Sequence, residues 1–278
     1  MSAPAHSARA RFSAAVSGPD ERIDLGAAAL LIAAQEYPQL ALEPYLRRLD
    51  VLAERVNDRL SNETAPPVVL GELTRVLFSE EGLRGNEAAY YDPRNSFLND
   101  VLDRKLGIPI SLGVVVLEVG RRLGLPLEGL GFPGHFLVRY RGEAVSLLID
   151  PFDGGRIRFE DQAQELLDRV YGGIVRIKPE FMRPIGRRDI LERMLRNLKG
   201  IYLNAKEDHR ALGIIDLLLA LKPEARQEVR DRGIMLARIG RYDEAIEQLE
   251  LYLDFAPGAT DATRVRQYIL RLSEAAGR

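Results

Sequence analysis

The chain has 278 residues, which is enough for two modest domains or one large one. Apolar residues make up 46% of it and charged residues 29%, proportions that are typical of a globular protein in water. Its formal net charge of −2 provides no long-range attraction to phosphate backbones or anionic membranes. We therefore expect neither a nucleic acid nor a membrane as a partner.

The sequence contains no cysteine, and its three histidines are His6, His135 and His209. The lack of thiols excludes disulfides, Cys-ligated zinc and thiol catalysis. The wide spacing of the histidines disfavours a histidine-rich metal site, so we expect no cofactor. Because the sequence shows neither an 18-residue apolar run nor the apolar region of a secretion signal, we expect a cytoplasmic protein.

The N-terminal part of the chain reads as a tail followed by helices. Residues 1–20 are rich in Ala, Ser and Pro, and we predict that they form a disordered tail. Helical periodicity follows over 24–33, 43–60 and 68–78, with Pro66-Pro67 between the second and third segments. These segments predict a helical cap over residues 21–85.

A core domain is predicted over residues 86–180, and the run GIPISL from Gly107 to Leu112 stands at its centre. Ser111 is a good helix N-cap, and an apolar stripe with helical spacing follows it. Gly124 and Pro126 end this helix. A preceding helix is expected from Asn95 or Ser96 to Leu106.

Three short strands are predicted after that helix, over 127–130, 136–140 and 145–149. His135 stands just before the second strand, and Asp150 follows the third, before Pro151. The chain order is therefore a serine at a helix N-terminus, a histidine at a strand start and an aspartate at a strand end.

This order resembles the core of the transglutaminase-like, papain-related superfamily. The strings NSFLNDVLDRKLGIPISL, LGLPLEGLGFPGHFLVR and LLIDPFDGG, between Asn95 and Gly155, resemble its bacterial SirB-type branch. In that branch the core precedes tetratricopeptide repeats. The resemblance implies that Ser111 stands at the nucleophile position, where the superfamily has a cysteine. It also implies that His135 would act as the base, oriented by Asp150.

Each candidate site residue also has an ordinary structural role. Ser111 can be a plain N-cap, and as a nucleophile it would need general-base help from His135, because a hydroxyl is a weak acid. The turn residue Asp150 can simply end a strand. Three further residues could line a cleft beside Ser111, or could be a cap and a polar helix face; they are Asn95, Asn99 and Arg104.

The C-terminal part, residues 189–278, is predicted to be a helical-repeat domain. Ala211 and Pro223 recur as Ala245 and Pro257, in both cases after 34 residues, which is the length of a tetratricopeptide repeat. Residues 171–188 carry two adjacent glycines, two prolines and four basic side chains, and they predict the domain boundary.

Together these patterns predict an α+β fold with a helical cap, a transglutaminase-like (papain-like) core and an all-α C-terminal repeat domain. We expect a protein-binding or regulatory protein, with a protein or peptide as its partner. Two alternatives stay open. One is a hydrolase or acyl transferase acting on amide bonds through Ser111, His135 and Asp150, and the other is a purely structural scaffold.

Overall fold

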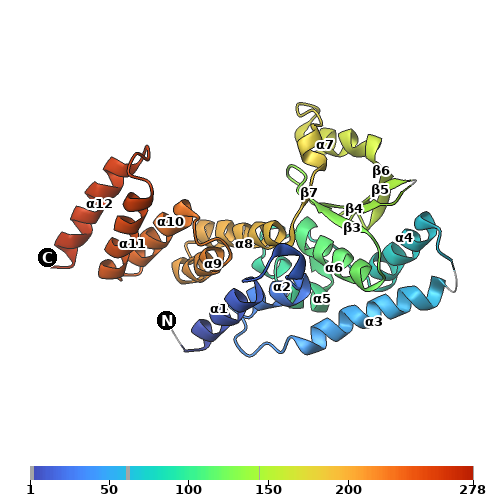
Figure 1. The fold of residues 1–278 in the computed structure, drawn as a ribbon, viewed down its shortest axis with the longest axis horizontal. Helices are drawn as coiled ribbons and strands as arrows, with labels where there is room; N and C mark the ends of the chain where they lie inside the picture. Colours follow the sequence, from blue (N-terminus) through green and yellow to red (C-terminus); the bar gives the residue numbers. More distant parts are fainter. Residues whose placement is uncertain (1–2, 61–62, 144, 278) are drawn as a thin grey trace. The chain divides into compact units, whose positions relative to one another are not determined.

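The computed structural model describes residues 3–60, 63–143 and 145–277 (Figure 1). The chain divides into two compact units. The core unit spans Gly18–Met194, and the repeat unit combines the residues up to Ser17 with those from Leu195 onward. The predicted α+β class is confirmed, because helices precede and follow a single five-stranded sheet.

The core unit contains most of the helices that surround the sheet. They are α2 (Leu25–Ala33), α3 (Glu43–Leu60), α4 (Pro66–Thr74), a π-helical turn (Arg75–Glu80), α5 (Leu98–Arg104), α6 (Pro109–Arg122), α7 (Ala163–Tyr171) and the first part of α8 (Arg187–Asn204). Short 3-10 turns occupy Asp20–Arg22, Pro93–Asn95, Glu160–Gln162 and Pro179–Met182. In the ranges described, no helix is both long and apolar enough to cross a membrane.

The sheet is antiparallel, with the strand order β6-β5-β4-β3-β7. Its strands are β3 (Leu127–Leu130), β4 (Leu137–Arg141), β5 (Ser146–Asp150), β6 (Arg156–Phe159) and β7 (Pro184–Ile185). A parallel pair of two-residue strands, β1 (Arg84–Gly85) and β2 (Leu106–Gly107), lies outside it. The first three strands of the sheet fall within one residue of the predicted ones.

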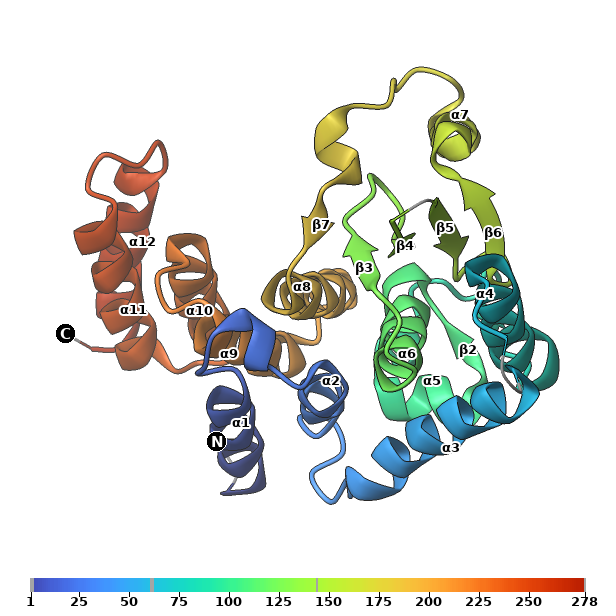
Figure 2. The same ribbon diagram turned by 45° about the vertical axis from the view of Figure 1, so that its right-hand side comes forward.

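Helix α6 is the centre of the core unit, and every residue from Pro109 to Gly120 is buried. It packs against β3 and β4 (Figure 2). Two glycines allow the close approach: a Cβ at Gly113 would lie 2.4 Å from the Phe136 ring, and one at Gly120 would lie 2.1 Å from Leu127. The amphipathic α3 packs against the same helix through a buried side that includes Leu49.

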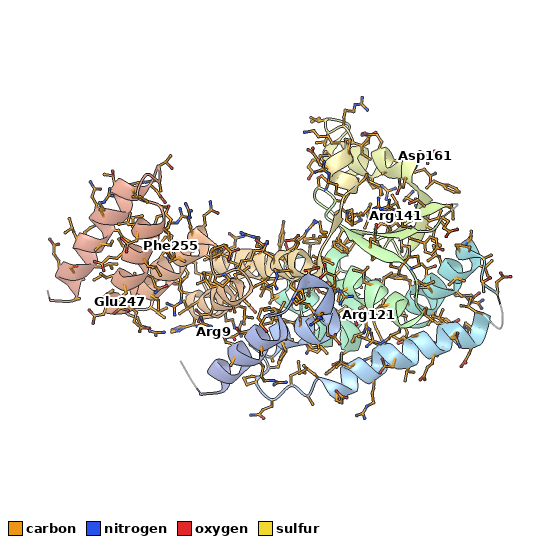
Figure 3. All side chains as sticks on the ribbon, viewed as in Figure 1. Arg9, Arg121, Arg141, Asp161, Glu247 and Phe255 are labelled. Atoms are coloured by element: carbon orange, nitrogen blue, oxygen red, sulfur yellow. The ribbon has the colours of Figure 1, made fainter. Side chains whose placement is uncertain are left out.

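The predicted disordered tail is wrong for residues 3–15, which form helix α1 (Ala3–Ala15). Ala8, Phe12 and Val16 are all buried, and their four-residue spacing puts them on one face. That face packs on α9, where Arg9 also lies 3.6 Å from Asp216 (Figure 3 labels Arg9). The composition is poor in large apolar residues, but one phenylalanine among small residues suffices to dock a helix. Residues 1–2 lie outside the described part of the chain.

The repeat unit consists of antiparallel helices that follow the predicted 34-residue period. After the end of α8 come α9 (Asp208–Leu221), α10 (Arg226–Arg238), α11 (Tyr242–Phe255) and α12 (Ala262–Ala275). Ala211 and Ala245, which are one period apart, are both fully buried. A Cβ at Gly233 would lie 2.8 Å from Leu249 and 3.2 Å from the carbonyl oxygen of Ala245, so α10 and α11 are in close contact.

The structure divides the chain within α8, between Met194 and Leu195, rather than at residues 171–188. The segment 171–188 belongs to the core unit for two reasons. Val175, Phe181 and Met182 pack on a buried cluster that includes Leu167, and β7 adds a strand to the sheet.

The start of α8 is also fastened within the core unit. The carboxylate of Asp20 accepts hydrogen bonds from the backbone N–H groups of Arg187 and Arg188, at 2.8 and 2.7 Å. A carboxylate at a helix N-terminus satisfies free N–H groups and favours the helix dipole. A residue 167 positions away in the sequence therefore caps this helix.

Candidate functional site: a histidine–aspartate cavity

Strand pairing brings His135 and Asp150 together. In an antiparallel pair the start of one strand lies beside the end of the next, and Val138 of β4 faces Ile149 of β5. His135 precedes β4 and Asp150 ends β5, so the two side chains meet at one end of the sheet. The distance from His135 Nε2 to Asp150 Oδ1 is 2.7 Å, which is that of a hydrogen bond.

The aspartate of this pair is held in its ionised form. Burial alone would raise the pKa of the Asp150 carboxyl, but the hydrogen bond and the attraction to His135 outweigh burial, and the pKa is lowered. The same oxygen also accepts the backbone N–H groups of Phe152 and Asp153, each at 3.1 Å. Asp150 thereby orients the imidazole as a fixed carboxylate.

The histidine is fixed by its own loop as well. The backbone N–H of His135 donates to Phe132 O, and the adjacent Gly134 has a φ of 64°, which favours glycine. The partly buried guanidinium of Arg193 donates to the carbonyl oxygens of both Phe132 and His135, and desolvation lowers the pKa of Arg193. Residues 132–135 are therefore held in place from α8.

The His135–Asp150 pair lines a cavity of about 310 Å³. Its walls come from the loop before α5, the first turn of α6, the two strand ends and α7. The lining residues are Glu87, Tyr90, Pro109, Gly134, His135, Asp150, Phe152, Asp153, Leu166 and Arg169. None of these is a serine, threonine, lysine or cysteine.

Ser111 is not part of this lining. Its side chain is fully buried, and its hydroxyl lies 2.5 Å from the carbonyl oxygen of Asn95, to which it donates. The hydroxyl oxygen of Ser111 also accepts a hydrogen bond from the backbone N–H of Ile108, at 3.1 Å. A Cβ at Gly107 would lie 2.9 Å from this hydroxyl, so the surroundings are tightly closed.

The N-terminus of α6 begins earlier than predicted. The N-cap is Ile108, Pro109 is the first helical residue, and Ser111 is the third. Proline suits the first helical position because its missing N–H is not needed there and its φ is already helical. As a consequence, the residue of this turn that faces the His135–Asp150 pair in the cavity is Pro109.

The three predicted cleft residues lie outside the cavity lining. Asn95 is fully buried, and its amide group binds Asn86 and the carbonyl oxygens of Ala89 and Tyr90. Arg104 contacts Asp92 at 3.3 Å. Asn99 is buried, and its Oδ1 makes no hydrogen bond with the described residues. Asn95 and Arg104 thus organise the loop that precedes α5.

Comparison with known proteins supports this architecture. The profile described as Transglutaminase-like superfamily matches residues 43–196, which is more than half of the chain. The chain belongs to the transglutaminase-like superfamily. A profile described as Tetratricopeptide repeat matches residues 198–269, which correspond to the helices of the repeat unit. Tetratricopeptide repeats generally mediate protein–protein interactions.

Relatives of this chain match most of its length. A UPF0162 protein of Xylella fastidiosa is 38% identical over 257 residues, covering 91% of this chain and 92% of the relative. A UPF0162 protein of Vibrio cholerae is 32% identical, covering 72% and 74%. Protein SirB1 of Salmonella typhimurium is 25% identical, covering 84% and 86%. The resemblance to the SirB-type branch is confirmed.

Several residues that line the cavity were not predicted from the sequence. Tyr90 and Phe152 form an aromatic wall, with ring centroids 5.9 Å apart, and the Phe152 ring is 6.2 Å from that of His135. Burial raises the pKa of the Tyr90 hydroxyl, so it stays neutral. Phe152 could have been predicted as a cavity residue, because it follows Asp150-Pro151 in the sequence. Glu87 and Arg169 come from distant elements, and no sequence pattern links them to His135.

The chemistry of the cavity follows from these groups. His135 can exchange a proton with a bound group, and Asp150 supports its charge. Within the described residues, no three His, Asp or Glu side chains are grouped to hold a metal ion. The cavity is a small space lined by an imidazole, two aromatic rings and several charged side chains.

Proposed function

We propose that this chain is a non-catalytic, protein-binding member of the transglutaminase-like superfamily. The observation that carries the proposal is the placement of the first turn of α6. Pro109, which has no reactive side chain, lines the cavity beside the His135–Asp150 pair, while Ser111 is fully buried. A nucleophile must lie within hydrogen-bonding reach of its base and be open to substrate.

A pair of cysteine variants tests this placement, because the chain has no cysteine of its own. The thiol of Pro109→Cys would stand at a helix N-terminus in the cavity of His135, and both neighbours favour a thiolate. We expect its alkylation by iodoacetamide to titrate below the reference thiol pKa of about 8.5. The thiol of Ser111→Cys should be alkylated slowly, because the position is closed to solvent.

The wild-type chain should not react with fluorophosphonate probes, which label activated serines. Rapid labelling that disappears in Ser111→Ala but persists in Ser273→Ala would contradict the proposal. It would instead support the second candidate function, an amide hydrolase or acyl transferase. The intact His135–Asp150 pair is the observation in favour of that candidate. It would require the Ser111 hydroxyl to leave the carbonyl oxygen of Asn95.

The binding half of the proposal rests on the repeats. Affinity capture with the full chain should recover a protein that is lost with Ala245→Phe, which disturbs the contact between α10 and α11. The protein should be kept with Arg141→Gln, which changes an exposed residue at the end of β4 that does not line the cavity. If both variants still captured the protein, the repeats would not be the binding surface. Recovery of no protein by the wild-type chain would count against a binding function.

A further inference from the structure

Three arginines converge on one oxygen atom beside the cavity. Asp153 Oδ2 lies 3.2 Å from Arg156, 3.0 Å from Arg158 and 3.4 Å from Arg169. Arg156 and Arg158 are two residues apart on β6, so they share a face of the sheet. Arg169 comes from α7 and, like Asp153, lines the cavity.

One carboxylate cannot satisfy three guanidinium groups. Each arginine carries five N–H donors in a planar fork that fits a carboxylate or phosphate bidentately. The side chain of Arg158 is only 8% exposed, and its buried Nε makes no hydrogen bond with the described residues. The side chains of Arg156 and Arg169 are 57% and 56% exposed, so they are open to a ligand. The cluster therefore has an excess of positive charge and of unfilled donors.

Two further carboxylates line the cavity, those of Asp150 and Glu87. Asp150 is engaged by His135 and by two backbone N–H groups. The carboxylate of Glu87 makes no ion pair with the described residues and stands on the wall formed before α5. A cationic ligand would be drawn to Glu87, and an anionic ligand to the arginines. The arginines outnumber Glu87 and have the more complementary geometry.

We propose that Arg156, Arg158 and Arg169 bind an anionic group of a peptide partner, with the adjoining residue of the peptide in the His135 cavity. The shared chemistry is a set of negatively charged oxygens, from an acidic side chain or from a phosphoryl group. The aromatic wall of Tyr90 and Phe152 receives the apolar part of that residue. This assignment rests on the proposed binding function, because it treats the cavity as a binding site and not as a reaction centre.

Histidine resonances of the full chain provide the readout, since there are only three histidines. The ring of His135 lies in the cavity, and His209 on α9, in the repeat unit, is an internal reference. The probes are blocked tripeptides Gly-Glu-Gly, Gly-Gln-Gly and Gly-phosphoserine-Gly. We expect the glutamate peptide to shift the His135 ring saturably, and the neutral glutamine peptide to bind roughly 10-fold more weakly or worse. Raising the salt concentration should weaken the difference.

Variants separate the anionic from the cationic alternative. Arg169→Gln should weaken binding of the glutamate peptide about 10-fold, and Glu87→Gln should leave it equal or tighter. Arg141→Gln is the matched control, because this exposed arginine at the end of β4 (labelled in Figure 3) contacts no residue of the cluster.

The outcomes are distinct. Preference for the phosphoserine peptide, lost in Arg169→Gln, would assign the anion to a phosphoryl group and support the proposal. Equal affinity for the glutamate and glutamine peptides would overturn it, and so would weakening by Glu87→Gln but not by Arg169→Gln. Either of these failures leaves the reactivity of Pro109→Cys and Ser111→Cys unchanged, so a non-catalytic cavity and an anion-binding cavity are tested separately.

Discussion

The hydroxyl of Ser111 donates a hydrogen bond to the backbone carbonyl of Asn95, 2.5 Å away, and so joins the start of α6 to the loop that precedes α5. The two residues are 16 positions apart in the sequence. Since the same hydroxyl accepts the N–H of Ile108, one side chain satisfies two backbone groups in a closed interior. The family resemblance implies a nucleophile at this position, whereas the geometry of Ser111 is that of a side chain that links two backbone segments by hydrogen bonds.

Replacing Ser111 by alanine should therefore destabilise the chain. The substitution leaves the N–H of Ile108 and the carbonyl of Asn95 buried without this partner, which typically costs about 1–3 kcal/mol. Urea unfolding of Ser111→Ala measures this cost. Ser273→Ala is the control, because among the described residues its hydroxyl bonds only to a helical carbonyl, that of Ile269. A change within about 0.5 kcal/mol is expected. Equal free energies of unfolding for both variants would show that the hydrogen bonds of Ser111 do not stabilise the fold.

The His135–Asp150 pair should make stability depend on pH in the acidic range. The pKa of Asp150 is lowered in the folded chain, so the ionised carboxylate contributes stability above its unfolded pKa of about 3.9. That contribution is lost as the pH falls through the folded pKa. The difference in free energy of unfolding between wild type and Asp150→Asn should be constant near neutral pH and should shrink below about pH 4.

Denaturant titrations between pH 3 and pH 7, an interval that brackets the unfolded aspartate pKa of about 3.9, check this dependence. In a His135→Gln background the pH-dependent part should be smaller, because the main partner that lowers the pKa of Asp150 is gone. A difference that grows on acidification would contradict the assigned direction of the shift.

The docking of α1 on α9 predicts a large effect of Phe12. This side chain is fully buried, and Phe→Ala substitutions at such positions cost about 3–5 kcal/mol. Thermal unfolding of Phe12→Ala should show the loss. Phe255→Ala is the matched control, because Phe255 on α11 is 44% exposed (labelled in Figure 3). If both variants melted like the wild type, α1 would not be docked in solution.

The repeat packing predicts that Ala245 tolerates no large side chain. It is fully buried opposite Gly233, and Ala245→Phe should cost about 1–3 kcal/mol by overpacking. Glu247→Phe places the same ring on an exposed position of the same helix (labelled in Figure 3) and should have little effect on the melting temperature. A reversed order of the two melting temperatures would refute the repeat assignment.

The fold was largely predictable where patterns are local. Helical spacing after Ser111 predicted α6, although this helix begins earlier, at Pro109. Short segments separated by turn residues predicted β3, β4 and β5 to within one residue. The missed strands are short. β6 (Arg-Ile-Arg-Phe) alternates over only four residues, and β1, β2 and β7 have two residues each, so that pairing with their neighbours defines them as strands.

The site was predictable only in part, for the same reason. The meeting of His135 and Asp150 follows from strand order, which the sequence shows. The environment of Ser111 depends on the carbonyl of Asn95, a group that every residue possesses and that no sequence pattern marks. The cluster of Arg156, Arg158 and Arg169 likewise exists only because β6 and α7 approach Asp153 from different sides.

The docking of α1 on α9 has a consequence for synthesis. The ribosome makes α1 first, but the surface that buries Phe12 is completed only when Leu221 has been added. Roughly 200 residues must be translated in between, which takes about 10–40 s at ordinary rates of elongation. During that time the whole core unit can emerge and fold, while α1 waits with its apolar face uncovered. A nascent chain stalled before α9 should therefore be a better substrate for chaperones that hold exposed helices than the finished protein is.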